Sequence, residues 1–100
     1  MHALDALGNP VRREIVVRLR ARPATVGEIA ARFPVSRPAI SRHLAMLQQA
    51  GLVTARASGA RTLYAIRLEG LAPVRSYLDG FWDEALARLE QLARREAEAK

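Results

Sequence analysis

Apolar residues recur with helical spacing through the first part of the chain. Val11, Ile15 and Leu19 follow one another at every fourth position, which predicts the buried stripe of a helix over residues 10–20. Asn9 lies directly before this stretch, and a proline opens it. An asparagine side chain can cap free backbone N–H groups, and a proline at the first helical position loses no hydrogen bond. These residues therefore predict where the helix begins.

Two further helices follow, with only a short turn between them. Residues 25–33 open with Thr-Val-Gly-Glu, in which the threonine and the glutamate have the spacing of a capping box. Residues 36–50 open with Ser36, a capping residue, and are followed by Gly51, which accepts the left-handed backbone of a helix end without strain. The apolar row of this second helix consists of Ile40, Leu44 and Leu47.

The period of the pattern then changes to two. Residues 53–68 alternate around Gly59, which predicts a β-hairpin with a tight turn. One face of its second strand would hold Tyr64, Ile66 and Leu68. Residues 71–98 are rich in Ala, Leu, Arg and Glu and predict a long last helix, while residues 3–7 predict a short first one. We expect one domain over residues 1–100, mostly α with a small β-hairpin.

The helix over residues 36–50 has a distinctive polar face. On a helical wheel, the side opposite the apolar row shows small residues, an arginine and polar side chains, with no acid. Arginine can bind guanine through two hydrogen bonds, glutamine can bind adenine, and serine can bind a phosphate or a base edge. This composition is typical of a helix that enters the DNA major groove. The face consists of Pro38, Ser41, Arg42, Ala45 and Gln49, with Arg37 and Gln48 at its flanks.

Charge is concentrated in the same part of the chain. The net charge is +6, from 16 basic and 10 acidic residues. Residues 29–68 contain six arginines and no Asp or Glu, whereas the preceding segment carries +2 and the following one −2. A merely solvated surface usually mixes both signs. The uneven distribution therefore favours a polyanionic partner such as double-stranded DNA.

The order of these elements is that of a helix-turn-helix unit followed by a wing. The second helix of such a unit enters the groove, and the hairpin lies beside it. Arg56 and Arg61 flank the hairpin tip, within reach of the DNA backbone or a minor groove. A single basic helix would say little. The whole arrangement, inside a segment without carboxylates, is a specific signal for DNA binding.

At this point the chain resembles a known family, the ArsR-type winged helix-turn-helix repressors of bacteria. The resemblance rests on ALGNPVRREIVVRL at 6–19, TVGEIAARFPVSRPAISRHLAMLQQAGLV at 25–53 and SGARTLYAI at 58–66. It implies a winged helix-turn-helix fold that dimerises through the terminal helices. It also implies a homodimeric transcriptional repressor that binds a pseudo-palindromic operator, with its own operon as a candidate target. The DNA contacts that it implies are the wing and Ser36, Arg37, Pro38, Ser41 and Arg42.

Many relatives of this kind sense a metal, and the residues here favour the metal-free subgroup. The chain has no cysteine, and its last helix has no histidine. Asp79, Asp83 and Glu84 lie close together there, but carboxylates alone would form only a weak site for hard ions. His43 lies at the edge of the apolar row, so we interpret it as a boundary residue that offers a nitrogen to backbone or phosphate. We expect no metal and no cofactor.

The last helix carries an apolar stripe that is wider than a two-stranded seam requires. We expect this stripe, together with the first helix, to form a homodimer interface, because an uncovered patch of that size is unusual in a monomer. A second interpretation is that Phe81 and Trp82 line an effector pocket between protomers. The expected interface residues are Leu4, Leu7, Leu71, Val74, Leu78, Phe81, Trp82, Leu86 and Leu89.

Other classes of function fit the sequence less well. It has no Ser/His/acid set, glycine-rich phosphate loop or paired-histidine motif, so we do not expect an enzyme. A winged-helix module that binds protein would favour a mixed or acidic recognition face. A repressor released by a metal or a small organic effector remains an alternative, with the effector unknown. No signal-type leader or membrane span is recognisable, so a cytoplasmic protein is expected.

Overall fold

A computed structural model describes residues 1–99 of the chain. The single-domain span expected over residues 1–100 therefore ends one residue outside the described part. The elements follow in the order α1 (Ala3–Ala6), α2 (Pro10–Ala21), α3 (Val26–Ala30), α4 (Arg37–Gln49), β1 (Val53–Ser58), β2 (Arg61–Ile66), a 3₁₀ turn η1 (Leu68–Leu71) and α5 (Ala72–Ala99).

The helix starts predicted from the sequence are confirmed by their caps. The Asn9 side chain accepts hydrogen bonds from the first backbone N–H groups of α2, at 2.8 and 3.2 Å. Thr25 and Glu28 form the reciprocal capping box of α3. The Ser36 hydroxyl accepts a 3.3 Å hydrogen bond from the Ala39 N–H at the start of α4. At the other end of α4, Gly51 has φ 77°, as its expected role in the helix end requires.

The length predicted for α3 was wrong. We expected it over residues 25–33, whereas α3 ends at Ala30. The backbone N–H groups of Arg32 and Phe33 bond to carbonyls three residues earlier, which closes a tighter turn in place of further α-helix. This turn carries Phe33, half-buried against the core, and leads directly to the cap of α4.

The wing is a two-stranded antiparallel hairpin in which Val53 pairs with Ile66 and Ser58 with Arg61. Gly59 at its tip has φ 62°, which a tight turn of this kind favours. Ala24 and Tyr64 exchange backbone hydrogen bonds of 3.0 and 2.8 Å, which join the segment before α3 to β2. The wing is thereby fixed against the helix-turn-helix unit.

The predicted end of the hairpin was also wrong. Strand β2 ends at Ile66, and Leu68 begins η1 with 67% of its surface exposed, so it is not on the inner face of the wing. The Arg67 N–H donates to the Leu52 carbonyl and its guanidinium to the Gly51 carbonyl, at 2.8 and 3.3 Å. These bonds turn the chain out of the hairpin and towards α5.

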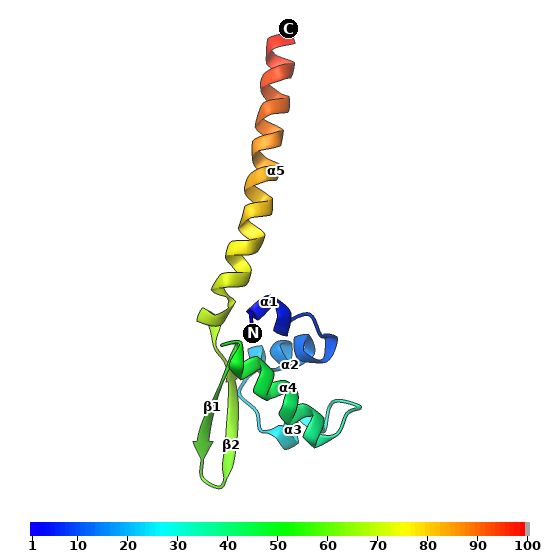
Figure 1. Ribbon diagram of the computed structural model, residues 1–100, viewed down its shortest axis with the longest axis vertical. Helices are drawn as coiled ribbons and strands as arrows, with labels where there is room; N and C mark the ends of the chain where they lie inside the picture. Colours follow the sequence, from blue (N-terminus) through cyan, green and yellow to red (C-terminus); the bar gives the residue numbers. More distant parts are fainter. Residues whose placement is uncertain (100) are drawn as a thin grey trace.

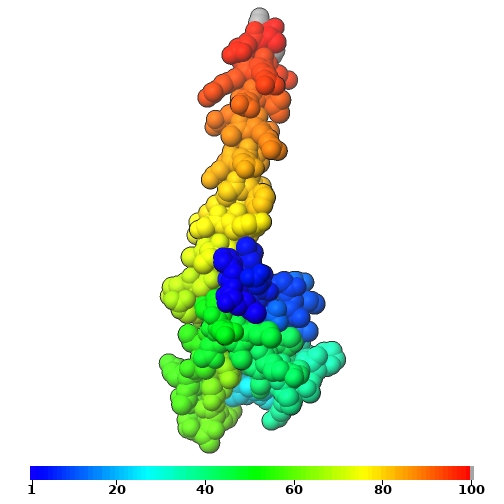
Figure 2. Space-filling model, in the orientation of Figure 1, coloured from blue at the N-terminus to red at the C-terminus, as the bar shows by residue number. Residues whose placement is uncertain are grey.

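Two unlike parts result (Figure 1). The first part, which we call the head, comprises residues 1–71 and holds every buried residue of the described chain. The second part is α5, which projects from the head as a single rod and contains no buried residue (Figure 2). The molecule accordingly measures 71 × 25 × 24 Å. The core of the head consists of Ala3, Ala6, Ile15, Leu19, Ala24, Ile29, Ile40, Leu44, Leu47, Leu52 and Val53.

Candidate nucleic-acid interface

Helix α4 turns one face into the core and the opposite face to the outside. Ile40, Leu44 and Leu47 are fully buried, as the periodicity predicted. The opposite side is exposed, in agreement with the helical wheel, although the Arg37 side chain at its start lies against α3. The exposed residues are Ser36, Arg37, Pro38, Ser41, Arg42, Ala45, Met46, Gln48 and Gln49.

Arg37 does not extend freely from the start of α4. Its guanidinium lies over Gly27 of α3, where an added Cβ would come within 3.1 Å of Nη2. Together with Arg61 of the wing, it lines an open hollow between α3 and β2. Gly27 thus leaves room for a cation at this position. Arg37 and Arg61, which lie 24 residues apart in the sequence, are brought to the same hollow.

One acid belongs to this hollow as well. Hydrogen bonds from the backbone and hydroxyl of Thr25 lower the pKa of Glu28, and the nearby charges of Arg61 and Arg22 lower it further. Glu28 therefore stays ionised at neutral pH, where it completes the cap of α3. Its charge offsets part of the positive charge of the two arginines. The cations of the hollow are accordingly weaker candidates for phosphate contacts than Arg42, which has no acid beside it in the sequence.

His43 and Arg12 meet at the side of α4. Arg12 Nη1 lies 3.5 Å from His43 Nδ1, and Arg12 Nε donates a 2.6 Å hydrogen bond to the Ala6 carbonyl of α1. A guanidinium can only donate, so a hydrogen bond between the two requires Nδ1 to accept and the neutral ring to carry its proton on Nε2. Burial lowers the pKa of His43, and the positive charges of Arg12 and Arg42 lower it further. The histidine is therefore neutral at pH 7, and its partner is an arginine.

Sequence reasoning missed Arg12. The residue lies 31 positions before His43 and beside the apolar stripe of α2, with no motif to mark it. Its guanidinium also donates to Met46 Sδ at 3.2 Å. Arg12 thus connects the end of α1 to two side chains on α4. Such a connection between helices leaves no periodic signal in the sequence.

The two wing arginines are exposed, as expected. Arg56 lies opposite Leu63 in the register, and Arg61 lies opposite Ser58 beside the tip. The other face of β2 carries Tyr64 and Ile66, which pack against the core of the head. The basic side of the wing is thus fixed by the burial of its apolar side.

Known proteins resemble this chain over most of its length. A family model described as a helix-turn-helix domain matches residues 7–56. The HTH-type transcriptional regulator Rv2034 of Mycobacterium tuberculosis is 48% identical over 90 residues, which cover 90% of this chain and 84% of that protein. The chain belongs to the ArsR-type helix-turn-helix transcriptional regulators. It is thus a DNA-binding regulator of transcription and not an enzyme.

Solved structures agree with this assignment. The crystal structure of a possible transcriptional regulator for arsenical resistance is 43% identical, with a TM-score of 0.78, over 89% of this chain and 93% of that one. The homodimeric winged helix-turn-helix DNA-binding domain of Mb0332 from Mycobacterium bovis is 30% identical, with a TM-score of 0.66, over 82% and 76% of the two chains. The winged helix-turn-helix fold expected from the sequence is confirmed.

Asp79, Asp83 and Glu84 lie close together in the sequence of α5. Within residues 1–99, no three His, Asp or Glu side chains come together in a group that could hold a metal ion. Of the acids on α5, Asp79 lies 3.8 Å from Arg75 as an ion pair.

Within residues 1–99, no helix has the length and apolar character needed to cross a membrane.

Proposed function

We propose that this ArsR-type regulator is a homodimeric repressor that binds a pseudo-palindromic operator without a metal cofactor. The observation that carries the proposal is the outer face of α4, which is exposed, free of acids and held in place by a fully buried opposite face. Such a face suits the major groove, because its side chains can donate hydrogen bonds to base edges and include no carboxylate that the DNA phosphates would repel.

Dimerisation is supported by the exposed side chains of α5. Trp82 has 68% of its surface exposed and Leu89 62%, and the described chain offers nothing that covers them. Large apolar residues in a row are unusual on a free surface. The homodimeric state of the Mb0332 domain supports a two-fold pairing here as well. We assign Leu78, Phe81, Trp82, Leu86 and Leu89 to this interface.

The first helix and the start of α5 have a mixed role in this proposal. Leu7, Leu71 and Val74 are half-buried and pack against the core of their own head. Leu4 is half-buried too. Their remaining surface lies where α5 leaves the head, so we assign these four residues to the base of the interface. The part of α5 beyond them must then supply most of the contact.

Two heads related by a two-fold axis would present two α4 helices to one side of the duplex. Half-sites about 34 Å apart, or a multiple of that distance, would match such a pair. The groove-facing surface consists of Ser36, Arg37, Pro38, Ser41, Arg42 and Ala45. His43 supports this surface from the side. Arg56 and Arg61 contact the backbone beside it. Repression follows where the operator overlaps a promoter.

Two measurements test the proposal. Selection of bound fragments from genomic DNA with the purified protein should yield one repeated, two-fold symmetric sequence. On that operator, Arg42→Ala should weaken specific binding by about 1–3 kcal/mol, because it removes a base contact. Arg94→Ala, which lies on the distal part of α5 about 160° from Leu78 and so opposite the stripe, serves as a matched arginine control. Equal affinity for the selected sequence and for scrambled duplexes would refute the proposal.

A further inference from the structure

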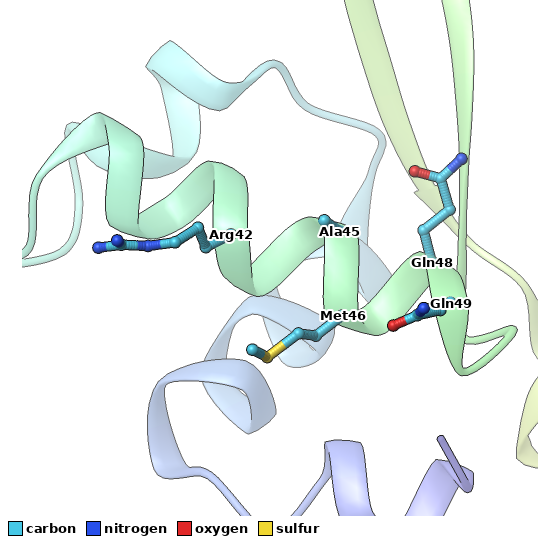
Figure 3. A pocket seen from close by; sticks show the side chains of 5 residues that line it. All are labelled: Arg42, Ala45, Met46, Gln48 and Gln49. Carbon is cyan, nitrogen blue, oxygen red and sulfur yellow. The ribbon is translucent and has the colours of Figure 1, made fainter.

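The outer face of α4 is not uniformly polar. A shallow hollow lies on it, lined by Arg42, Ala45, Met46, Gln48 and Gln49 (Figure 3). Two of these five side chains are apolar and adjacent in the sequence, and both are exposed, Met46 to 37%. A polar surface that only bound phosphates would not need them. The hollow is therefore suited to an apolar group.

The apolar wall of the hollow is held in place. Figure 3 shows the Met46 side chain directed towards α2. There Arg12 Nη1 donates to Met46 Sδ at 3.2 Å, while Arg12 Nε is anchored on the Ala6 carbonyl. Ala45 adds a single methyl group on the outward side. The hollow is thus shaped by a fixed thioether and a small residue, so a small apolar group can enter between them.

The charge around the hollow limits what the group can belong to. Arg42 lines one end, and the surrounding segment, residues 29–68, contains six arginines and no acid. A partner helix with an apolar face usually carries charges of both signs beside that face, so this uniformly basic surface would not select it. A polyanion that carries apolar groups fits both features. In the major groove of DNA, the only apolar group on the base edges is the 5-methyl group of thymine.

We infer that Ala45 and Met46 form a specificity pocket for a thymine 5-methyl group. The inference rests on the proposed function, in which the outer face of α4 enters the major groove. Ala45 lies three residues after Arg42, a rise of about 4.5 Å along the helix. Successive base pairs are about 3.4 Å apart. The thymine therefore lies one or two base pairs from the base that Arg42 contacts, and Gln49 lies one turn further along the same face.

The test changes one chemical group at a time on the DNA bases. The selected operator is compared with duplexes in which one thymine at a time is replaced by deoxyuridine, which removes only the methyl group. Loss of one buried methyl should weaken binding about fourfold at one position in each half-site. Replacement of single guanines by 7-deazaguanine identifies the base that Arg42 contacts. The thymine effect should fall within two base pairs of it.

Protein variants connect the effect to the pocket. In Met46→Gln and Ala45→Ser, the affinity ratio between the thymine and deoxyuridine duplexes should fall to about one. Glutamine is similar to methionine in length and helix propensity, and Ala45 is exposed, so the fold should persist. Val17→Gln changes an exposed apolar residue on α2 and should keep the wild-type ratio.

The outcomes separate the inference from the proposed function. Specific operator binding with no deoxyuridine effect near the Arg42 position would overturn the inference alone. An effect that persists unchanged in both Met46→Gln and Ala45→Ser would also overturn it, because another residue would then contact the methyl group. Absence of any sequence-specific duplex binding would overturn the proposed function, and the inference with it.

Discussion

The head and α5 show two ways in which one sequence uses its apolar residues. In the head, eleven small and aliphatic side chains form one buried core, and the surface that remains is basic on the α4 side. In α5, the apolar stripe includes larger residues such as Phe81 and Trp82, and every described residue beyond Val74 is exposed. Residues 69–100 carry a net charge of −2, against +6 for residues 29–68.

This difference indicates where stability and function lie. The head has a core of its own, whereas α5 is stabilised by its backbone hydrogen bonds, by local side-chain pairs and by its start on the head. Large apolar residues in a row are unusual on a free surface, so the bare stripe of this 28-residue helix favours a partner. The packing of the head explains its stability, whereas the exposed apolar stripe of α5 indicates a missing contact.

The largest effect is expected from a charge in the apolar stripe of α5. Trp82→Glu would place an unpaired carboxylate in the proposed interface, dissociate the dimer and so separate the two heads. Operator affinity should then fall by roughly 10²–10⁴, the gain expected from linking two binding sites. Sedimentation velocity and a binding titration measure the two losses.

Ser76→Glu is the matched control for Trp82→Glu. It adds the same charge to α5 on the side of the helix opposite the stripe, about 160° from Leu78 on the wheel. This variant should remain dimeric and bind the operator. A dimer that survives Trp82→Glu would show that the bare stripe is not the interface.

The next effect concerns the junction between the two parts. Gly70 is buried in η1, and a Cβ there would overlap the carbonyl oxygen of Gly51 at the end of α4. Gly70→Ala should therefore push η1 away from the head and lower the free energy of unfolding by about 1–3 kcal/mol. Urea denaturation, followed by circular dichroism, measures the change.

The same substitution in α5 should have the opposite sign. Gly80 is interior to the helix, with nothing within 4 Å of an added Cβ, and lies about 200° from Leu78, away from the stripe. Gly80→Ala should raise stability by up to about 1 kcal/mol, because alanine is the better helix former. Equal effects of the two substitutions would contradict the division between a packed junction and an open rod.

Much of the head could be predicted because its signals are local. The caps at Asn9, Thr25 and Ser36 are hydrogen bonds over two or three residues, so they can be recognised in the sequence. The exposed face of α4 follows from the 3.6-residue period alone. For these features, the sequence contains all of the determining contacts.

Other features depend on contacts between distant segments. The early end of α3 is a local exception, because its turn is closed by hydrogen bonds to Ile29 and Ala30 and no capping residue marks it. The position of Arg37 over Gly27 and the contact of Arg12 with His43 require the helices to be packed first. The partner of α5 is a still more distant case, since it lies outside the chain. The roles of the site residues in binding remain predictions.

A smaller effect is expected from pH, and only in the head. The pKa of His43 lies below its usual value of 6.5, so between these two values the unfolded chain binds more protons than the folded one. The contribution of His43 to stability is present above pH 6.5 and is lost as the pH falls through the folded pKa. A protonated ring could no longer accept from Arg12.

The measurement is the unfolding free energy at pH 7.5 and 5.5 for the wild type and for His43→Gln. The wild type should lose more stability across this window, because glutamine does not titrate. Glu28 contributes little here, since its pKa lies below 4.5. An identical loss in the two proteins would show that His43 does not carry a depressed pKa.

The smallest effect, none at all, is expected from metals. Relatives that sense metals would change their DNA affinity, whereas the acids of α5 here are exposed, and one of them faces Arg75 across 3.8 Å. Oxygen ligands alone bind zinc, cadmium and nickel weakly, because these ions favour nitrogen or sulfur ligands. Operator affinity should therefore be equal with stoichiometric zinc, cadmium or nickel and with a chelator, in a titration at fixed salt. A reproducible loss with one of these ions would mean that the dimer assembles ligands across α5 that one protomer does not, and Asp79→Asn and Asp83→Asn would then identify them.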